Sequence, residues 1–186
     1  MTRDIRRIFV HCTAGNQKQT LKDLLNEFKA KGWSVPGYHY VVFPDGKVEQ
    51  LLREDKISNG VQGYNSTSIN VAYVGGIDNK GRATDNRTEE QKKALLQLLK
   101  DLKIKYPNAH IMGHRDIWGK DKSKWKKQCP CFDAEKEYEN LDDIKLEKYA
   151  DSTVEKANFA ANPVENSPAK LKSLLDKIKG LAPWNK

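Results

Sequence analysis

The chain has no long hydrophobic run. None of its apolar stretches approaches the roughly 18 residues that a helix needs to cross a bilayer, so no transmembrane segment is predicted. Residues 1–7 are polar and run directly into a strand-like segment, without the apolar region of a secretory signal. We therefore expect a protein that is made in the cytoplasm without a signal peptide.

Cysteine is scarce as well. There are three cysteines in 186 residues, namely Cys12, Cys129 and Cys131. An odd number in a chain of this length argues against a disulfide framework. It fits a reducing compartment in which at least one thiolate has a chemical role.

The composition is that of a globular protein with an excess of positive charge. Hydrophobic residues make up 38% and charged residues 31%, with a net charge of +8. This charge favours anionic partners such as nucleic acid, acidic lipid or the acidic polymers of a cell wall. The basic residues lack the aromatic interleaving of RNA-binding modules, and no zinc-finger or helix-turn-helix pattern is present. A nucleic-acid partner is therefore not expected.

The first half of the chain alternates between strand and helix patterns. Residues 5–11 are β-branched and aromatic, which predicts a buried strand that ends at His11. Residues 20–31 carry leucines and a phenylalanine with helical spacing, between a possible cap at Thr20 and a stop at Gly32. Residues 38–43 and 47–51 flank Pro44-Asp45-Gly46 and predict a β-hairpin.

The second half continues this alternation. Residues 69–74 predict a strand, residues 88–105 a helix that opens with a capping box, and residues 109–112 a short strand that leads to His114. We expect an α/β domain over residues 1–146, with a central mixed β-sheet flanked by helices. Residues 147–186 are predicted to form a linker and a C-terminal amphipathic helix over 168–180, as a helical extension of the domain.

Three residues suggest a metal site when they are taken together. His11 and His114 both lie at predicted strand ends, where ligands gather in α/β sheets, and Cys129 lies in a later loop. Taken singly, each histidine is more often structural, and the cysteine could be a buried thiol. Zinc accepts imidazole nitrogen and thiolate sulfur, and its catalytic sites use three protein ligands with an open fourth position. The long spacings fit no zinc-finger motif and are weak evidence by themselves.

Five ordered motifs over about residues 5–140 carry a family resemblance. They are Ile8-Phe9-Val10-His11-Cys12-Thr13-Ala14, then Gly32-Trp33 with Gly37-Tyr38-His39-Tyr40 and Asp45-Gly46, then 63–69 with 74–81, then Gly113-His114-Arg115-Asp116, and finally Cys129-Pro130-Cys131-Phe132-Asp133. This order resembles the type 2 N-acetylmuramoyl-L-alanine amidases. That family includes the amidase-type phage lysozymes and the animal peptidoglycan recognition proteins.

The resemblance implies a fold, a cofactor and a set of site residues. One Zn²⁺ ion is expected on His11, His114 and Cys129, in a fold like that of the amidases and peptidoglycan recognition proteins. Tyr38 matches the active-site tyrosine of the family, and Lys127 matches the catalytic lysine of the phage enzymes, two residues before the ligand cysteine.

Other residues near the expected site are open to two interpretations. His39 and Asn65 are candidate substrate-binding residues, although His39 could instead be a core histidine paired with backbone. The stretch from His114 to Cys129 looks longer than in the short phage enzymes and is expected to line the groove. If the alignment slips by one residue within its basic run, Lys126 would take the place of Lys127.

The function implied is hydrolysis of the amide between N-acetylmuramic acid and L-alanine in peptidoglycan. We expect a monomeric, phage-type endolysin that reaches the cell wall after release at lysis. The alternatives are a non-catalytic peptidoglycan-binding module and a cytoplasmic amidase that recycles wall fragments. A cysteine hydrolase with Cys12 beside His11 is disfavoured, because adjacent strand residues point to opposite faces of the sheet.

Overall fold

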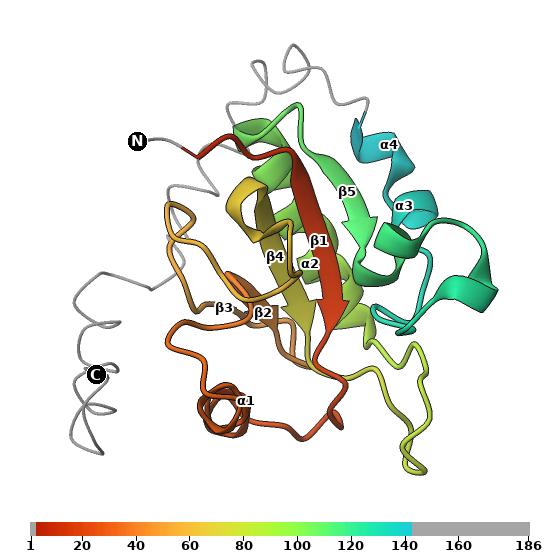
Figure 1. Ribbon diagram of the computed structural model, residues 1–186. Helices are drawn as coiled ribbons and strands as arrows, with labels where there is room; N and C mark the ends of the chain where they lie inside the picture. Colours follow the sequence, from red (N-terminus) through yellow and green to blue (C-terminus); the bar gives the residue numbers. More distant parts are fainter. Residues whose placement is uncertain (1–2, 143–186) are drawn as a thin grey trace. The chain divides into compact units, whose positions relative to one another are not determined.

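The computed structural model describes residues 3–142, which fold around one five-stranded sheet (Figure 1). The sheet has the order β3-β2-β4-β1-β5. Its strands are β1 (Arg7–Cys12), β2 (Tyr40–Val42), β3 (Val48–Gln50), β4 (Ser68–Tyr73) and β5 (His110–Gly113). All neighbouring pairs are parallel except the β2–β3 hairpin. The predicted mixed sheet of an α/β domain is confirmed.

Two main helices begin at the capping residues that the sequence suggests. Helix α1 (Leu21–Ala30) follows Thr20, and α2 (Glu89–Lys105) follows Thr88. In both, the threonine hydroxyl accepts a hydrogen bond from the third helical N–H, and the side chain at that position bonds back to the threonine N–H. Such a capping box satisfies two donors that the first turn of a helix would otherwise leave unpaired.

Helices cover the two faces of the sheet unequally. The larger hydrophobic cluster combines β1, β4 and β5 with the buried leucines of α2 and with the two short helices α3 (Ala134–Glu137) and α4 (Glu139–Asp142). The smaller cluster sets Leu24 and Phe28 of α1 against Val41, Ala72 and Val74. Since side chains alternate along a strand, His11 faces the α1 side and Cys12 the α2 side.

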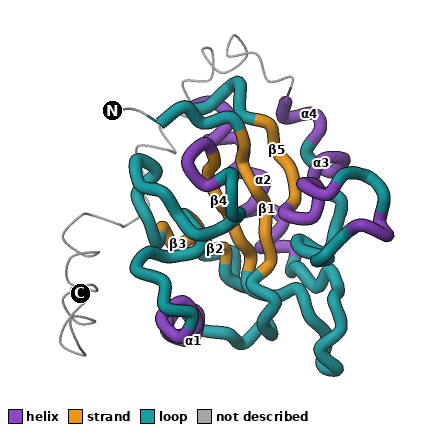
Figure 2. Tube along the Cα trace, in the orientation of Figure 1, coloured by secondary structure: helices purple, strands orange, loops and turns teal. Residues whose placement is uncertain are grey.

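The remaining segments are short helical turns and loops. They include three 3₁₀ turns, at Asn65–Thr67 (η1), His114–Trp118 (η2) and Lys122–Lys124 (η3). Long loops gather below the ends of β1 and β4 in the view of Figure 2, where the parallel strands end. Among residues 3–142, no helix has the length and hydrophobicity needed to cross a membrane.

The expected boundary near residue 146 stays a prediction. Residues 147–186, with the predicted linker and the amphipathic helix over 168–180, lie outside the described residues.

Candidate metal centre and active site

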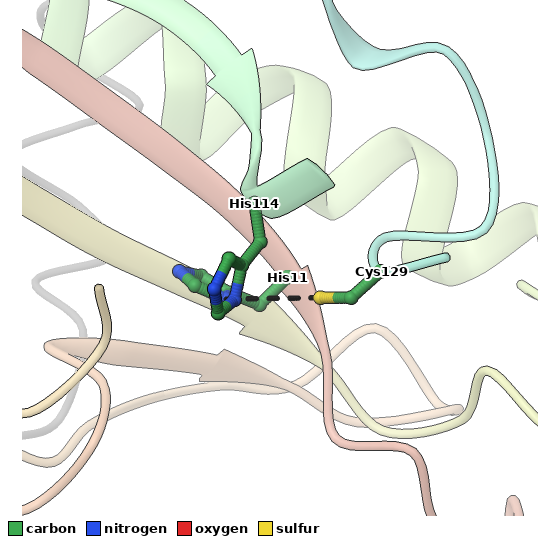
Figure 3. A group of neighbouring side chains, drawn as sticks. All are labelled: His11, His114 and Cys129. Carbon is green, nitrogen blue, oxygen red and sulfur yellow. Dashed lines mark hydrogen bonds between the residues drawn. The ribbon is translucent and has the colours of Figure 1, made fainter. Parts of the chain in front are cut away.

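Three side chains from distant parts of the chain converge at the end of the sheet. His11 comes from β1, His114 follows β5 directly, and Cys129 lies on the loop after η3 (Figure 3). One ligand atom from each residue lies within 4.8 Å of the other two. The Nδ1 atoms of the two histidines are 3.2 Å apart, and Nδ1 of His11 is 3.7 Å from Sγ of Cys129.

The strand register explains why the two histidines meet. Strands β1 and β5 are parallel neighbours, with Val10 opposite Gly113 at the last recorded pair. The next residue of each strand is a candidate ligand histidine, so both imidazoles emerge at the same level, at the carboxyl ends of the two strands. Asp116 accepts a hydrogen bond from the Gly113 N–H at 2.7 Å, which holds the turn that carries His114.

Close packing brings the third ligand to the histidines. The buried Tyr73 hydroxyl donates a 2.7 Å hydrogen bond to the Pro130 carbonyl. A Cβ added at Gly113 would lie 2.5 Å from Cδ of Pro130, so only glycine leaves space for the proline there. The backbone N–H of Cys12 points to the Cys129 sulfur at 3.3 Å. These contacts fix Cys129 beside His11.

The electrostatics keep both histidines neutral. Burial lowers the pKa of His11 to about 4, against the opposing effect of its hydrogen bond to Asn70, and the charge of Lys127 lowers it further. Burial, the neighbouring His11 and Lys127 lower the pKa of His114 to about 3. Neutral imidazoles have free lone pairs at neutral pH, and two such nitrogens 3.2 Å apart are suited to share a cation.

Tyr38 lies beside this cluster. Its ring centroid is 5.2 Å from that of His11, and its hydroxyl points to the Cys12 carbonyl at 3.5 Å. Burial of its hydroxyl, together with the nearby Cys129 and Cys12, raises the pKa of Tyr38 well above its usual value. The phenol therefore stays protonated and can act as a hydrogen-bond donor at the metal site.

The two lysines in question are both exposed. Lys127 is close enough for its charge to lower the pKa of both ligand histidines. Lys126 is not among the groups that perturb either histidine. The choice between Lys127 and Lys126 as the catalytic lysine stays a prediction.

The two candidate substrate-binding residues occupy different environments. His39 is fully buried, its Nδ1 accepts from the Asn70 N–H at 3.0 Å, and its Nε2 lies 3.1 Å from the Lys56 carbonyl. That arrangement fits the alternative of a core histidine paired with backbone. Asn65 is half-buried, and its side-chain oxygen accepts from the Val61 N–H at 2.7 Å. Its contact with substrate stays a prediction.

The other two cysteines pack beside the site. Cys12 is buried in the larger core cluster, and Cys131 is half-buried against it, with 3.7 Å between their sulfurs. The side chain of Cys12 faces away from His11, so the two residues cannot form the disfavoured nucleophile–base pair.

The basic stretch between His114 and Cys129 is folded around a tryptophan. The indole N–H of Trp125 donates to the Gly119 carbonyl at 2.8 Å, and the Arg115 guanidinium lies 4.2 Å from the centre of its ring. Trp118 stacks on the His114 ring, with 5.7 Å between centroids and 16° between planes.

Two contacts of the ligands were not anticipated from the sequence. They are this stacking of Trp118 on His114 and a hydrogen bond from His11 to Asn70, 59 residues away. The only signal for Asn70 was an amide inside an otherwise apolar strand.

Comparison with known families identifies the arrangement. The family model of the N-acetylmuramoyl-L-alanine amidases matches residues 1–132. The chain belongs to this amidase family. The endolysin of Klebsiella phage KP32 is 38% identical over 135 residues, which cover 72% of this chain and 85% of that protein. The endolysin of Escherichia phage T7 is 36% identical over 134 residues, with 71% and 84% covered.

Solved structures give the same result for the fold of the amidase. The endolysin of Thermus scotoductus bacteriophage Ph2119 superposes with a TM-score of 0.60 at 28% identity, over 76% of this chain and 87% of that one. The Drosophila peptidoglycan recognition protein SD gives a TM-score of 0.54 at 20% identity, over 70% and 76%, and supports the fold alone. The chain is thus an N-acetylmuramoyl-L-alanine amidase that resembles phage endolysins, with a candidate His-His-Cys metal site.

Proposed function

We propose that this amidase is zinc-dependent, with one Zn²⁺ ion held by His11, His114 and Cys129, and that it cuts peptidoglycan as a phage endolysin does. The observation that carries the proposal is the spacing of the three ligand atoms. Zinc–nitrogen bonds of about 2.05 Å and a zinc–sulfur bond of about 2.3 Å, at tetrahedral angles, separate two nitrogens by about 3.3 Å and nitrogen from sulfur by about 3.6 Å. The two separations from Nδ1 of His11 are 3.2 Å and 3.7 Å, and all three ligand atoms lie within 4.8 Å of one another.

The donor set supports catalysis more than a structural role. Structural zinc sites have four protein ligands, whereas catalytic sites have three and keep a position open for water or substrate. Among residues 3–142, the cluster contains three ligands. A bound zinc ion would lower the pKa of its water toward about 7 and polarise the scissile carbonyl.

The chain's own residues would then serve the cleavage of the amide. The protonated Tyr38 hydroxyl would donate a hydrogen bond to the carbonyl oxygen or to the leaving amine, and its position beside His11 supports this role. Lys127 would stabilise negative charge that develops on the carbonyl oxygen. The effect of its charge on the pKa of both histidines supports this role. We propose Tyr38 and Lys127 as the catalytic residues, and Asn65 as a candidate contact for the sugar–peptide substrate.

The substrate of this reaction is the amide between N-acetylmuramic acid and L-alanine. We propose that the enzyme acts on the intact wall after release, as a monomer. The net charge of +8 supports binding to an anionic wall polymer. A recycling amidase would instead prefer small soluble fragments.

The test compares turbidity loss of purified cell walls before and after chelation. We expect chelation to abolish lysis, stoichiometric zinc to restore it, and the products to carry a free L-alanine amino terminus. Full lysis by thoroughly zinc-free protein would refute the proposal. Preference for soluble muropeptides over intact walls would favour the recycling role.

Three substitutions assign the residues. Cys129→Ser should lose zinc and lysis together. Lys127→Ala should lower kcat by about 10²-fold or more with zinc still bound, which is the usual cost of losing one group that stabilises developing charge. Lys126→Ala is the matched control, because it removes the neighbouring exposed charge, and it should keep near-normal turnover. A larger loss with Lys126→Ala than with Lys127→Ala would reverse the assignment.

A further inference from the structure

A buried amide lies directly behind the first ligand histidine. Asn70 is in the middle of β4, is fully buried, and its side-chain oxygen lies 2.9 Å from Nε2 of His11. The other five residues of β4 are also buried, so an apolar residue would be expected at this position. A buried amide lowers stability unless its polar atoms are paired, so its presence requires a reason.

The amide nitrogen of Asn70 lies against two serine hydroxyls. It donates to the Ser58 hydroxyl at 2.8 Å and lies 3.4 Å from the Ser68 hydroxyl. The backbone N–H of Asn70 donates to Nδ1 of His39. With its nitrogen on the two serine hydroxyls, the amide presents its side-chain oxygen to Nε2 of His11.

The backbone is shaped to admit this side chain. A Cβ at Gly60 would lie 2.2 Å from Cγ and from the oxygen of Asn70. The loop therefore packs its bare backbone against the amide, and any larger residue at position 60 would displace it. Ser58, in the same loop, is fully buried as well. The loop and the strand together enclose the side-chain amide of Asn70.

The hydrogen bond to Asn70 has a consequence for the other nitrogen of His11. A neutral imidazole carries one proton, and the nitrogen that binds a metal must be bare. Nδ1 of His11 is the nitrogen that faces His114 and Cys129, so the proton must lie on Nε2. An oxygen acceptor at Nε2 stabilises that tautomer and also fixes the plane of the ring.

We propose that Asn70 is a positioning residue that holds His11 in the Nε2–H tautomer and so presents a bare Nδ1 to the metal. The inference rests on the proposed metal site. It assigns to one buried amide the role that a carboxylate or a backbone carbonyl has behind other metal-binding histidines. Asn70 itself touches neither metal nor substrate.

The test measures zinc affinity of the full chain by competition with a chromophoric chelator. Asn70→Leu keeps the volume, excludes water and removes the acceptor, and it should weaken zinc binding by about 10- to 100-fold. Asn70→Asp retains an oxygen at the same place and should stay within about threefold of the unmodified protein, as expected for a carboxylate behind a ligand histidine.

A matched control separates positioning from general damage to the fold. Gln91 is another fully buried carboxamide, on the α2 side of the sheet, where it donates to the carbonyls of Val42 and Val74. Gln91→Leu should lower stability and leave zinc affinity within about threefold, because its contacts do not reach the ligands. Equal loss of affinity in Gln91→Leu and Asn70→Leu would overturn the proposal, as would a normal affinity in folded Asn70→Leu.

A second measurement needs neither zinc nor a variant. Long-range proton–nitrogen NMR of the zinc-free protein reports which His11 nitrogen carries the proton. We expect the proton on Nε2, and a proton on Nδ1 would overturn the proposal even if Asn70→Leu fails to fold. If the unmodified protein binds no zinc but shows the Nε2–H tautomer, the proposed metal dependence fails while the role of Asn70 in fixing the tautomer stands.

Discussion

Arg87 offers the sharpest test of how the segment that carries Cys129 is held. Its side chain is 1% exposed, and all five of its N–H donors are used. Asp85 and Glu137 each accept two hydrogen bonds of 2.8 Å, and the Tyr138 hydroxyl accepts one of 3.2 Å. The guanidinium also lies 3.3 Å from the centre of the Phe132 ring. One buried cation thus joins the loop before α2 to the segment between Cys129 and α4.

The magnitude follows from what Arg87→Met would leave behind. The methionine keeps most of the contact with Phe132. It leaves the carboxylates of Asp85 and Glu137 without the hydrogen bonds that Arg87 donates. Removing one partner of a buried ion pair costs about 3–5 kcal/mol. Asp85 and Glu137 are 30% and 38% exposed, so water can partly replace the lost donors. We therefore expect the lower end, about 3 kcal/mol, or a fall in Tm of roughly 10 °C for a domain of this size.

The measurement is urea or thermal denaturation of the full chain. Arg82→Met is the control, because Arg82 also pairs with an aspartate in a loop, Asp78 at 2.6 Å, but is 71% exposed. An exposed pair contributes about 0–1 kcal/mol, so the control should unfold almost as the unmodified protein does. If the two variants differ by less than about 1 kcal/mol in the free energy of unfolding, the structural role assigned to Arg87 is wrong.

Three further predictions address the loops around the site and the pH dependence of folding. Tyr73→Phe should lower stability by about 1–2 kcal/mol in urea denaturation, because the Pro130 carbonyl loses its buried donor. Gly76→Ala should lower it by about 2 kcal/mol or more by the same assay, since φ is +100° and the added Cβ would lie 2.5 Å from Sγ of Cys12. Burial lowers the pKa of His39 from 6.5 to about 4, so between these values the unfolded chain binds more protons and stability falls as pH decreases. His11 and His114 contribute to the same slope, so His39→Gln should reduce it without abolishing it in a pH series of denaturation curves, and an unchanged slope would contradict the assignment.

Local patterns in the sequence were sufficient for most of the regular structure. The caps at Thr20 and Thr88 and the leucine spacing of α2 depend on residues three or four apart, and both helices begin where predicted. The predicted hairpin strands were too long, 38–43 against Tyr40–Val42. The reason is that the His39 carbonyl accepts hydrogen bonds from both Leu51 and Leu52, which interrupts regular pairing before Tyr40.

The elements that the sequence missed depend on contacts between distant residues. Helix α3 has four residues, and its position depends on Glu137 binding Arg87, 50 residues earlier. The turn η3 lies beside Trp125, whose ring packs under Arg115. Such short elements have no hydrophobic period to detect, and their stability comes from tertiary contacts more than from propensity.

The candidate metal site depends both on local sequence patterns and on contacts between distant residues. The positions of His11 and His114 at strand ends could be inferred from local patterns, and the parallel register of β1 and β5 then makes the two rings neighbours. No local pattern predicts the position of Cys129, because contacts among Tyr73, Gly113 and Pro130 bring its loop to the histidines. Perturbing those loop contacts should therefore weaken the thiolate ligand while the histidine pair stays in place. Tyr73→Phe is the most direct such change, because it removes only the hydrogen bond to the Pro130 carbonyl. A folded variant with unaltered zinc affinity would show that this hydrogen bond is not needed to position Cys129.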